Sequence, residues 1–143
     1  GFLRLPAPPE LETIFLERDN LRAILPPEHP LAALERVPLA ALCEDPFLML
    51  VKEKNTECAQ LFVQHGLTPN VRFTAWDDYA IMSMVENGLG ISVLPELILR
   101  RVPYRIVTRP LDVPAYRDIA LALRDKETAS LAVKRFLEYL KFR

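Results

Sequence analysis

Two short stretches of the sequence hold the polar residues best suited to binding a small ligand. In the first, Lys52, Lys54, Asn55 and Thr56 follow an apolar run and come at the start of a helical pattern. Free backbone N–H groups at a helix start, a capping Asn or Thr and two ammonium groups together attract a negatively charged ligand. The stretch therefore predicts an anion site. The alternative is an ordinary capped loop in solvent.

The second stretch is FTAWDDYA, in which Trp76, Asp78 and Tyr79 lie at the start of the next predicted helix. A carboxylate in a binding site favours a hydroxyl or an amine and disfavours an anion close by. In the alternative interpretation, Asp78 only caps the helix and Trp76 packs on the protein surface. The two stretches favour different ligand chemistry, and the sequence leaves the choice open.

Other chemically active residues lack the partners that catalysis or metal binding needs. His29 and His65 have no nucleophile or acid at a spacing that suggests a catalytic set, and Cys43 and Cys58 lack the spacing of zinc ligands. We therefore expect no catalytic residue, no metal and no cofactor. Cys58 follows a predicted helix start, which raises the hypothesis of a low-pKa, oxidant-sensing thiol. A buried, inert thiol is the alternative.

Composition limits the class of protein that carries these residues. The chain has 143 residues, of which 50% are hydrophobic, and a formal net charge of -1, so no charge excess points to nucleic acid or an anionic membrane. Its apolar runs are far shorter than the roughly 20 residues that cross a bilayer. Since no signal peptide precedes them, we expect one cytoplasmic globular domain without membrane contact.

Apolar spacing and thirteen prolines define the elements that must position the two stretches. Strands and helices are predicted to alternate, which is typical of an α/β layered fold. The predicted strands cover 2–5, 11–25, 47–50, 71–74, 91–94, 104–108 and 119–123, and the predicted helices cover 57–65, 79–87, 96–101 and 130–142.

The segment NGLGISVLP, residues 87–95, links three of these elements. Gly88 follows the last periodic residue of a helix, where glycine adopts a left-handed conformation at least cost. Gly90 is expected to allow a tight turn into a strand that is covered on both faces, and Pro95 suits the first position of the next helix. The segment therefore predicts a helix, a glycine turn, a buried strand and a second helix.

The unit MVENGLGISVLPE, preceded by HGLTPNVRFTAWDD, resembles the C-terminal half of the effector-binding domain of LysR-type transcriptional regulators. LRAILPPEHPLAALERVPLAAL is similar to that family's strand and proline-histidine-proline turn, and DPFLMLVKEKN to its next strand and loop. The four motifs occur in the family's order, and the resemblance covers nearly the whole chain.

This resemblance implies a periplasmic-binding-protein-like, bilobed effector-binding domain that the chain crosses twice, with the effector in the cleft. Residues 1–143 would be a partial domain, in which 11–92 form the complete second lobe and 1–10 with 93–143 the remaining part of the first. The family's winged helix-turn-helix and about two strand–helix units have no counterpart here. We therefore expect an N-terminally truncated fragment or an engineered piece.

The function implied by the resemblance is ligand sensing in a bacterial transcriptional regulator rather than catalysis. A small effector, expected to be an organic anion, would bind between the lobes and control DNA binding through the absent N-terminal domain. The family also implies a homodimer. A solute-binding protein of a transporter shares the bilobed fold and remains an alternative, as does a small α/β enzyme, against which the lack of a catalytic set counts. The full-length gene would distinguish the three.

Overall fold

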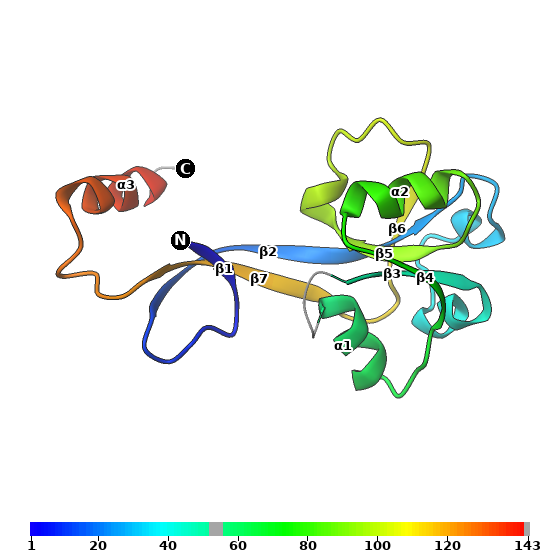
Figure 1. Ribbon diagram of the computed structural model, residues 1–143, viewed down its shortest axis with the longest axis horizontal. Coiled ribbons are helices and arrows are strands. Elements are labelled where there is room, and N and C mark those ends of the chain that lie inside the picture. Colours follow the sequence, from blue (N-terminus) through cyan, green and yellow to red (C-terminus); the bar gives the residue numbers. More distant parts are fainter. Residues whose placement is uncertain (52–55, 142–143) are drawn as a thin grey trace. The chain divides into compact units, whose positions relative to one another are not determined.

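The computed structural model describes residues 1–51 and 56–141, which form two compact units. One unit is Gly1–Arg18 with Asp118–Arg143, and the other is Asp19–Arg117. The chain passes from one unit to the other twice, once within each of two long strands (Figure 1).

Strands and helices alternate along the chain, which confirms the predicted α/β class. The elements are, in order, β1 (Phe2–Arg4), β2 (Glu12–Leu25), η1 (Pro30–Ala33), η2 (Leu39–Glu44), β3 (Pro46–Leu50), α1 (Glu57–Gln64), β4 (Asn70–Ala75), α2 (Asp78–Glu86), β5 (Ser92–Pro95), η3 (Glu96–Leu99), β6 (Val107–Pro110), β7 (Tyr116–Leu123) and α3 (Leu131–Lys141), where η denotes a 3-10 helix. Within the two described ranges, no helix is both long and apolar enough to cross a bilayer.

Three strands of the larger unit run in the same direction. β3 and β4 pair in parallel, with Leu50 opposite Ala75. β5 joins β3 through a parallel bridge between Phe47 and Ile91, and β2 pairs antiparallel with both β5 and β6. Because parallel strands end at the same edge of a sheet, the segments after β3, β4 and β5 all start at one edge.

Helices cover both faces of these strands (Figure 1). Side chains of successive strand residues point to opposite faces, so Ala23 and Leu25 of β2 join the cluster that contains α1 residues, while Ile24 joins the cluster of α2 residues. Phe47 and Leu48 of β3 divide in the same way, and Phe47 meets Phe62 of α1 edge to face, with ring centroids 5.2 Å apart. β5 is buried at all its positions, with Val93 in the cluster of α1 residues and Leu94 in the cluster of α2 residues, which confirms the prediction that the strand at 91–94 is covered on both faces.

The two glycines of NGLGISVLP have different roles. Gly88 has a φ of +74° and ends α2, as predicted, with its N–H donating to the Val85 carbonyl at 3.0 Å. Gly90 was predicted to permit a tight turn, and this explanation is wrong. A Cβ atom at Gly90 would lie 2.6 Å from the backbone oxygen of Pro46, so glycine is needed there because β3 passes too close for any side chain.

Two predicted elements differ from the structure. The strand predicted at 104–108 begins only at Val107, because Tyr104 and Ile106 lie in a loop that packs against the α2 cluster. The helix predicted at 96–101 is the short 3-10 helix η3, and Pro95 precedes it as the last residue of β5 rather than its first helical residue.

The boundaries of the larger unit also differ from the predicted second lobe, 11–92. β5 and β6 pair with residues 21–25 of β2, so the chain after residue 92 stays with this unit until Arg117. In the smaller unit, β1 pairs antiparallel with β7, and Leu137 is the buried residue of α3. Strand pairing between residues distant in sequence holds β5 and β6 in this unit.

The two glycines allow a matched test of this packing. We expect Gly88→Ala to lower the free energy of unfolding by about 1–2 kcal/mol, because only the left-handed conformation opposes it and no atom lies within 4 Å of the added carbon. Gly90→Ala should cost more, about 3 kcal/mol, since a backbone atom must move. Urea denaturation of both variants provides the measurement, and equal costs would contradict the close-approach explanation.

Candidate functional site

Of the two stretches singled out in the sequence, the structure describes Thr56 and the whole of the second, and these follow the paired parallel strands β3 and β4. Thr56 stands immediately before α1, on the chain that leaves β3, and Trp76 follows β4 directly. Leu50 and Ala75 are paired at the ends of these strands, and α1 and α2 are the helices that follow the two strands. Lys52, Lys54 and Asn55 belong to the same predicted set but lie outside the described residues.

Thr56 is the N-cap of α1, as the sequence suggested. Its hydroxyl oxygen accepts a hydrogen bond from the Ala59 N–H at 3.3 Å. The helix that it caps has eight residues and buries Cys58, Leu61 and Phe62 against the strands. Thr56 therefore has a structural role as the cap of a helix packed on the strands.

The start of α2 presents aromatic side chains to solvent. Trp76 is 73% exposed and Tyr79 is 54% exposed, whereas Asp78 is buried. Asp77, not Asp78, caps the helix, because its carboxylate accepts a hydrogen bond from the Tyr79 N–H at 3.3 Å. The alternative in which Asp78 is the cap is wrong, and the exposed aromatic rings offer apolar faces to a ligand.

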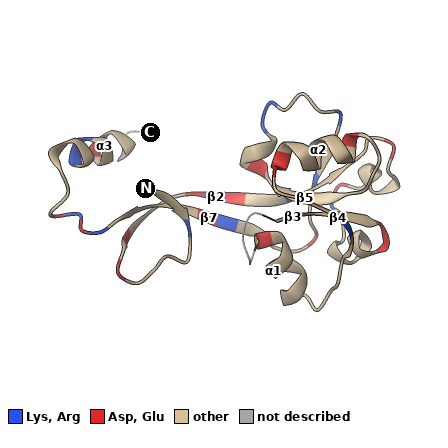
Figure 2. Ribbon diagram, in the orientation of Figure 1, with Lys and Arg blue, Asp and Glu red and all other residues tan. Residues whose placement is uncertain are grey.

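Acidic residues stand in the first turns of both helices (Figure 2). Glu57 occupies the first turn of α1 and Asp78 that of α2, where the partial positive charge of a helix start stabilises a carboxylate. The described part of this edge is therefore richer in negative charge than the sequence analysis assumed.

Sequence analysis missed a charged network at the same edge. Asp19 of β2 is 1% exposed, and its two carboxylate oxygens accept hydrogen bonds from the Leu97 N–H at 3.0 Å and from Nε of Arg117 at 2.9 Å. Nη1 of Arg117 lies 3.8 Å from Glu57 Oε1. Asp19 and Arg117 are 98 positions apart, so no local pattern signals their pairing.

Both histidines have structural partners. Nδ1 of His29 accepts a hydrogen bond from the Leu31 N–H at 3.0 Å, and its Nε2 lies 2.9 Å from an Asp45 oxygen. His65 ends α1, with Nδ1 2.9 Å from the Leu61 carbonyl. Residues 1–51 and 56–141 contain no group of three or more His, Cys, Asp or Glu residues placed to hold a metal ion.

The redox hypothesis for Cys58 is wrong. Burial, with a smaller contribution from the neighbouring Glu57 carboxylate, raises the pKa of the Cys58 thiol to about 12. A reactive thiol needs the opposite shift, because the thiolate is the nucleophile. Burial also raises the pKa of the half-buried Cys43.

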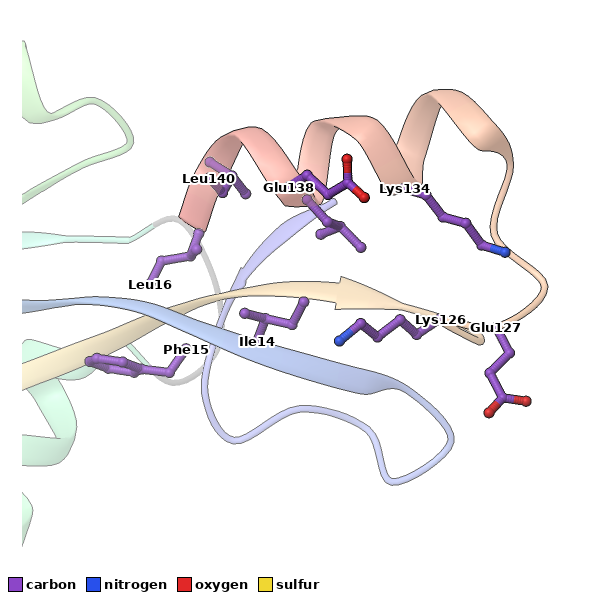
Figure 3. Close-up of a pocket in the computed structure, with 9 residues that line it drawn as sticks. Ile14, Phe15, Leu16, Lys126, Glu127, Lys134, Glu138 and Leu140 are labelled. Atoms are coloured by element: carbon purple, nitrogen blue, oxygen red, sulfur yellow. The ribbon is translucent and has the colours of Figure 1, made fainter. Parts of the chain in front are cut away.

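The smaller unit has a hollow of its own between β2 and α3, with a volume of about 710 Å³ (Figure 3). Its apolar lining comes from Ile14 and Leu16 of the strand and Leu140 of the helix, and Lys126 and Lys134 lie at its margin. The predicted site residues do not line this hollow, and it carries no catalytic set.

Comparison with known proteins defines the class to which this fold and site belong. The family model for the LysR substrate-binding domain matches residues 1–143. The chain is a member of the LysR substrate-binding domain family. This membership confirms the resemblance found in the sequence, and the family is one of transcriptional regulators rather than of enzymes.

Relatives of known sequence are longer than this chain. The transcriptional regulator YvbU of Bacillus subtilis is 34% identical over 143 residues, which is 99% of this chain and 49% of that protein. The probable regulator LrrA of Synechococcus elongatus is 30% identical over 146 aligned residues, covering 99% of this chain and 48% of that protein. The chain thus spans about half the length of the relatives it matches.

Solved structures have the same fold. The regulatory domain of CcmR from Synechocystis PCC6803, in complex with 2-PG, superposes with a TM-score of 0.83 at 26% identity, covering 97% of this chain and 70% of that one. The C-terminal domain of a probable LysR family regulator from Rhodococcus gives a TM-score of 0.84 at 24% identity over 98% of this chain and 72% of that one. These matches confirm the periplasmic-binding-protein-like fold class.

The buried thiol leads to a simple test. In the native protein at pH 8, we expect a thiol reagent to modify Cys43 but to reach Cys58 only on unfolding, because its raised pKa and burial leave almost no accessible thiolate. Mass spectrometry of labelled peptides, with and without denaturant, measures both sites in one sample. Rapid native labelling of Cys58 would restore the redox hypothesis.

Proposed function

We propose that this chain is the ligand-sensing part of a LysR-type transcriptional regulator and binds a small effector at the edge where α1 and α2 start. The observation that carries the proposal is the pairing of Leu50 with Ala75, which brings together the ends of the two parallel strands that precede α1 and α2. Ligands of open α/β sheets bind outside the carboxyl ends of the strands. The relative CcmR forms a complex with 2-PG, which supports a small-molecule effector.

The proposed effector is an organic anion. Lys52, Lys54 and Asn55, with Thr56, supply positive charge and N–H donors on one side of the site, and the exposed rings of Trp76 and Tyr79 form the opposite wall. Asp78 at the start of α2 is the proposed acceptor for a hydroxyl of the effector, which must reach a carboxylate that is only 6% exposed. The Glu57 carboxylate next to Thr56 repels an anion. The proposed anionic effector therefore needs the positive charge of Lys52 and Lys54 to bind here.

Effector binding is proposed to control transcription through an N-terminal DNA-binding segment of the full-length regulator, as in the relatives that share this domain. Action on DNA places the regulator in the bacterial cytoplasm. No catalytic step is proposed, because the family consists of regulators and both histidines are held by structural contacts.

The regulator is also proposed to form a homodimer through the outer strand of the larger unit. β4 pairs with β3 along one side, and Val71 and Phe73 on it are exposed apolar residues, as is Val63 on α1. An exposed strand with apolar side chains favours association with another chain.

The effector site can be tested in the full-length regulator by calorimetric titration with small organic anions, beginning with 2-PG. Lys54→Met should weaken effector binding about tenfold or more, because a charge-assisted hydrogen bond contributes roughly 1.5–3 kcal/mol. Thr56→Ala should weaken it similarly and also lower stability by about 1 kcal/mol through loss of the cap. Thr56→Ser keeps the capping oxygen and is the matched control. Unchanged affinity in both test variants would mean that the loop is only a solvated cap.

Self-association has a separate test. We expect Val63→Glu to lower the average mass measured by light scattering, because a charge in an apolar interface stays unpaired, while Val63 is so exposed that folding is little affected. Leu89→Glu changes another exposed apolar residue, one that belongs to neither β4 nor α1, and should leave the mass unchanged. A wild-type protein that remains monomeric at high concentration contradicts the proposed dimer.

A further inference from the structure

Arg117 connects parts of the larger unit that are far apart in sequence. Its Nε donates to the buried carboxylate of Asp19 at 2.9 Å, and its Nη1 lies 3.8 Å from Glu57 in the first turn of α1. The other oxygen of Asp19 holds the N–H of Leu97 at the start of η3. One guanidinium, with its partner Asp19, therefore joins the starts of two helices that follow two of the three parallel strands.

The Asp19–Arg117 pair lies where the chain passes between the two units. Asp19 lies in β2 and Arg117 in β7, and they are the first and last residues of the larger unit. These are the two strands through which the chain leaves that unit. The contact with Glu57 therefore connects the first turn of α1 directly to Arg117, a residue of one of these two strands.

Burial makes the Asp19–Arg117 pair a rigid connection rather than a surface contact. The side chain of Asp19 is fully buried and that of Arg117 is 22% exposed. A charge-assisted bond in such surroundings is screened little by water, and breaking it leaves a buried carboxylate without its cation. The neighbouring pair Arg18–Asp118, with Nε–Oδ1 at 2.8 Å, joins the same two strands in the smaller unit, but its arginine is 52% exposed.

We propose that Arg117 is a positioning residue for the effector site. It holds the first turn of α1 through Glu57 and the start of η3 through Asp19, and so keeps both helix starts in place relative to β2 and β7. This inference rests on the proposed effector site and adds the residue that couples it to the crossing strands. Lysine cannot replace arginine here, because a single ammonium lacks the fork that reaches Asp19 and Glu57 together.

Amide hydrogen exchange in the full-length regulator tests the proposal without any ligand. Arg117→Lys should speed exchange about tenfold at two amides remote in sequence, Leu97 in η3 and Ala59 in α1. The Leu97 N–H bonds directly to Asp19, and the Ala59 N–H bonds to the Thr56 cap of the helix turn that Glu57 connects to Arg117. The matched control is Arg18→Lys, which makes the same chemical change in the neighbouring pair and should leave both amides at the wild-type rate.

A double-mutant cycle separates the contact from the general effect of charge at a helix start. Glu57→Gln should speed exchange at Ala59 in the wild-type background and have a smaller effect when Arg117 is already lysine. The proposal is overturned if Arg117→Lys changes exchange only within β2 and β7, or by one common factor at all amides, since either result indicates a purely structural salt bridge. These outcomes leave the calorimetric test of the effector site unaffected.

Discussion

The contact between β3 and β5 joins the two parts of the sheet in the larger unit, and the rest of that unit is built on it. The N–H of Ile91 donates to the Pro46 carbonyl at 3.0 Å, and the N–H of Leu48 donates to the Ile91 carbonyl at 2.9 Å. The buried hydroxyl of Ser92 adds a bond of 2.6 Å to the Leu48 carbonyl. Because β3 carries β4 and β5 pairs with β2, this junction joins the two parts of the sheet, and Gly90 is the residue that lets the backbones approach.

The position of the candidate site follows from this junction. Once β3, β4 and β5 run in one direction, the segments that follow them start at one edge, and the chemistry of that edge is decided by α1, α2 and η3. Glu57, Asp78 and Glu96 stand in the first turns of these helices, so each helix start already has a carboxylate nearby. Selectivity for a ligand then depends on a balance between these acids and the cations around them.

Local signals in the sequence were sufficient for most of the elements, including the start of α1 and the end of α2. Gly88 and the apolar run after it predict the end of α2 and a strand buried on both faces, and Thr56 predicts the start of α1. Features that depend on contacts with residues distant in sequence could not be predicted from local patterns. Tyr104 and Ile106 have a strand-like composition but cover α2, and the need for glycine at position 90 comes from a residue 44 positions earlier, Pro46. The Asp19–Arg117 pair has the same cause, since only the paired strands bring those residues together.

The exposure of Trp76 has a practical consequence. It is the only tryptophan of the chain, and its indole is 73% exposed at the start of α2. Indole emission shifts to shorter wavelength when water around the ring is replaced by apolar atoms, and nearby charges change its intensity. Light emitted by this domain therefore comes chiefly from one ring at the edge where the parallel strands end, so the intrinsic fluorescence of the chain reports on that edge rather than on its core.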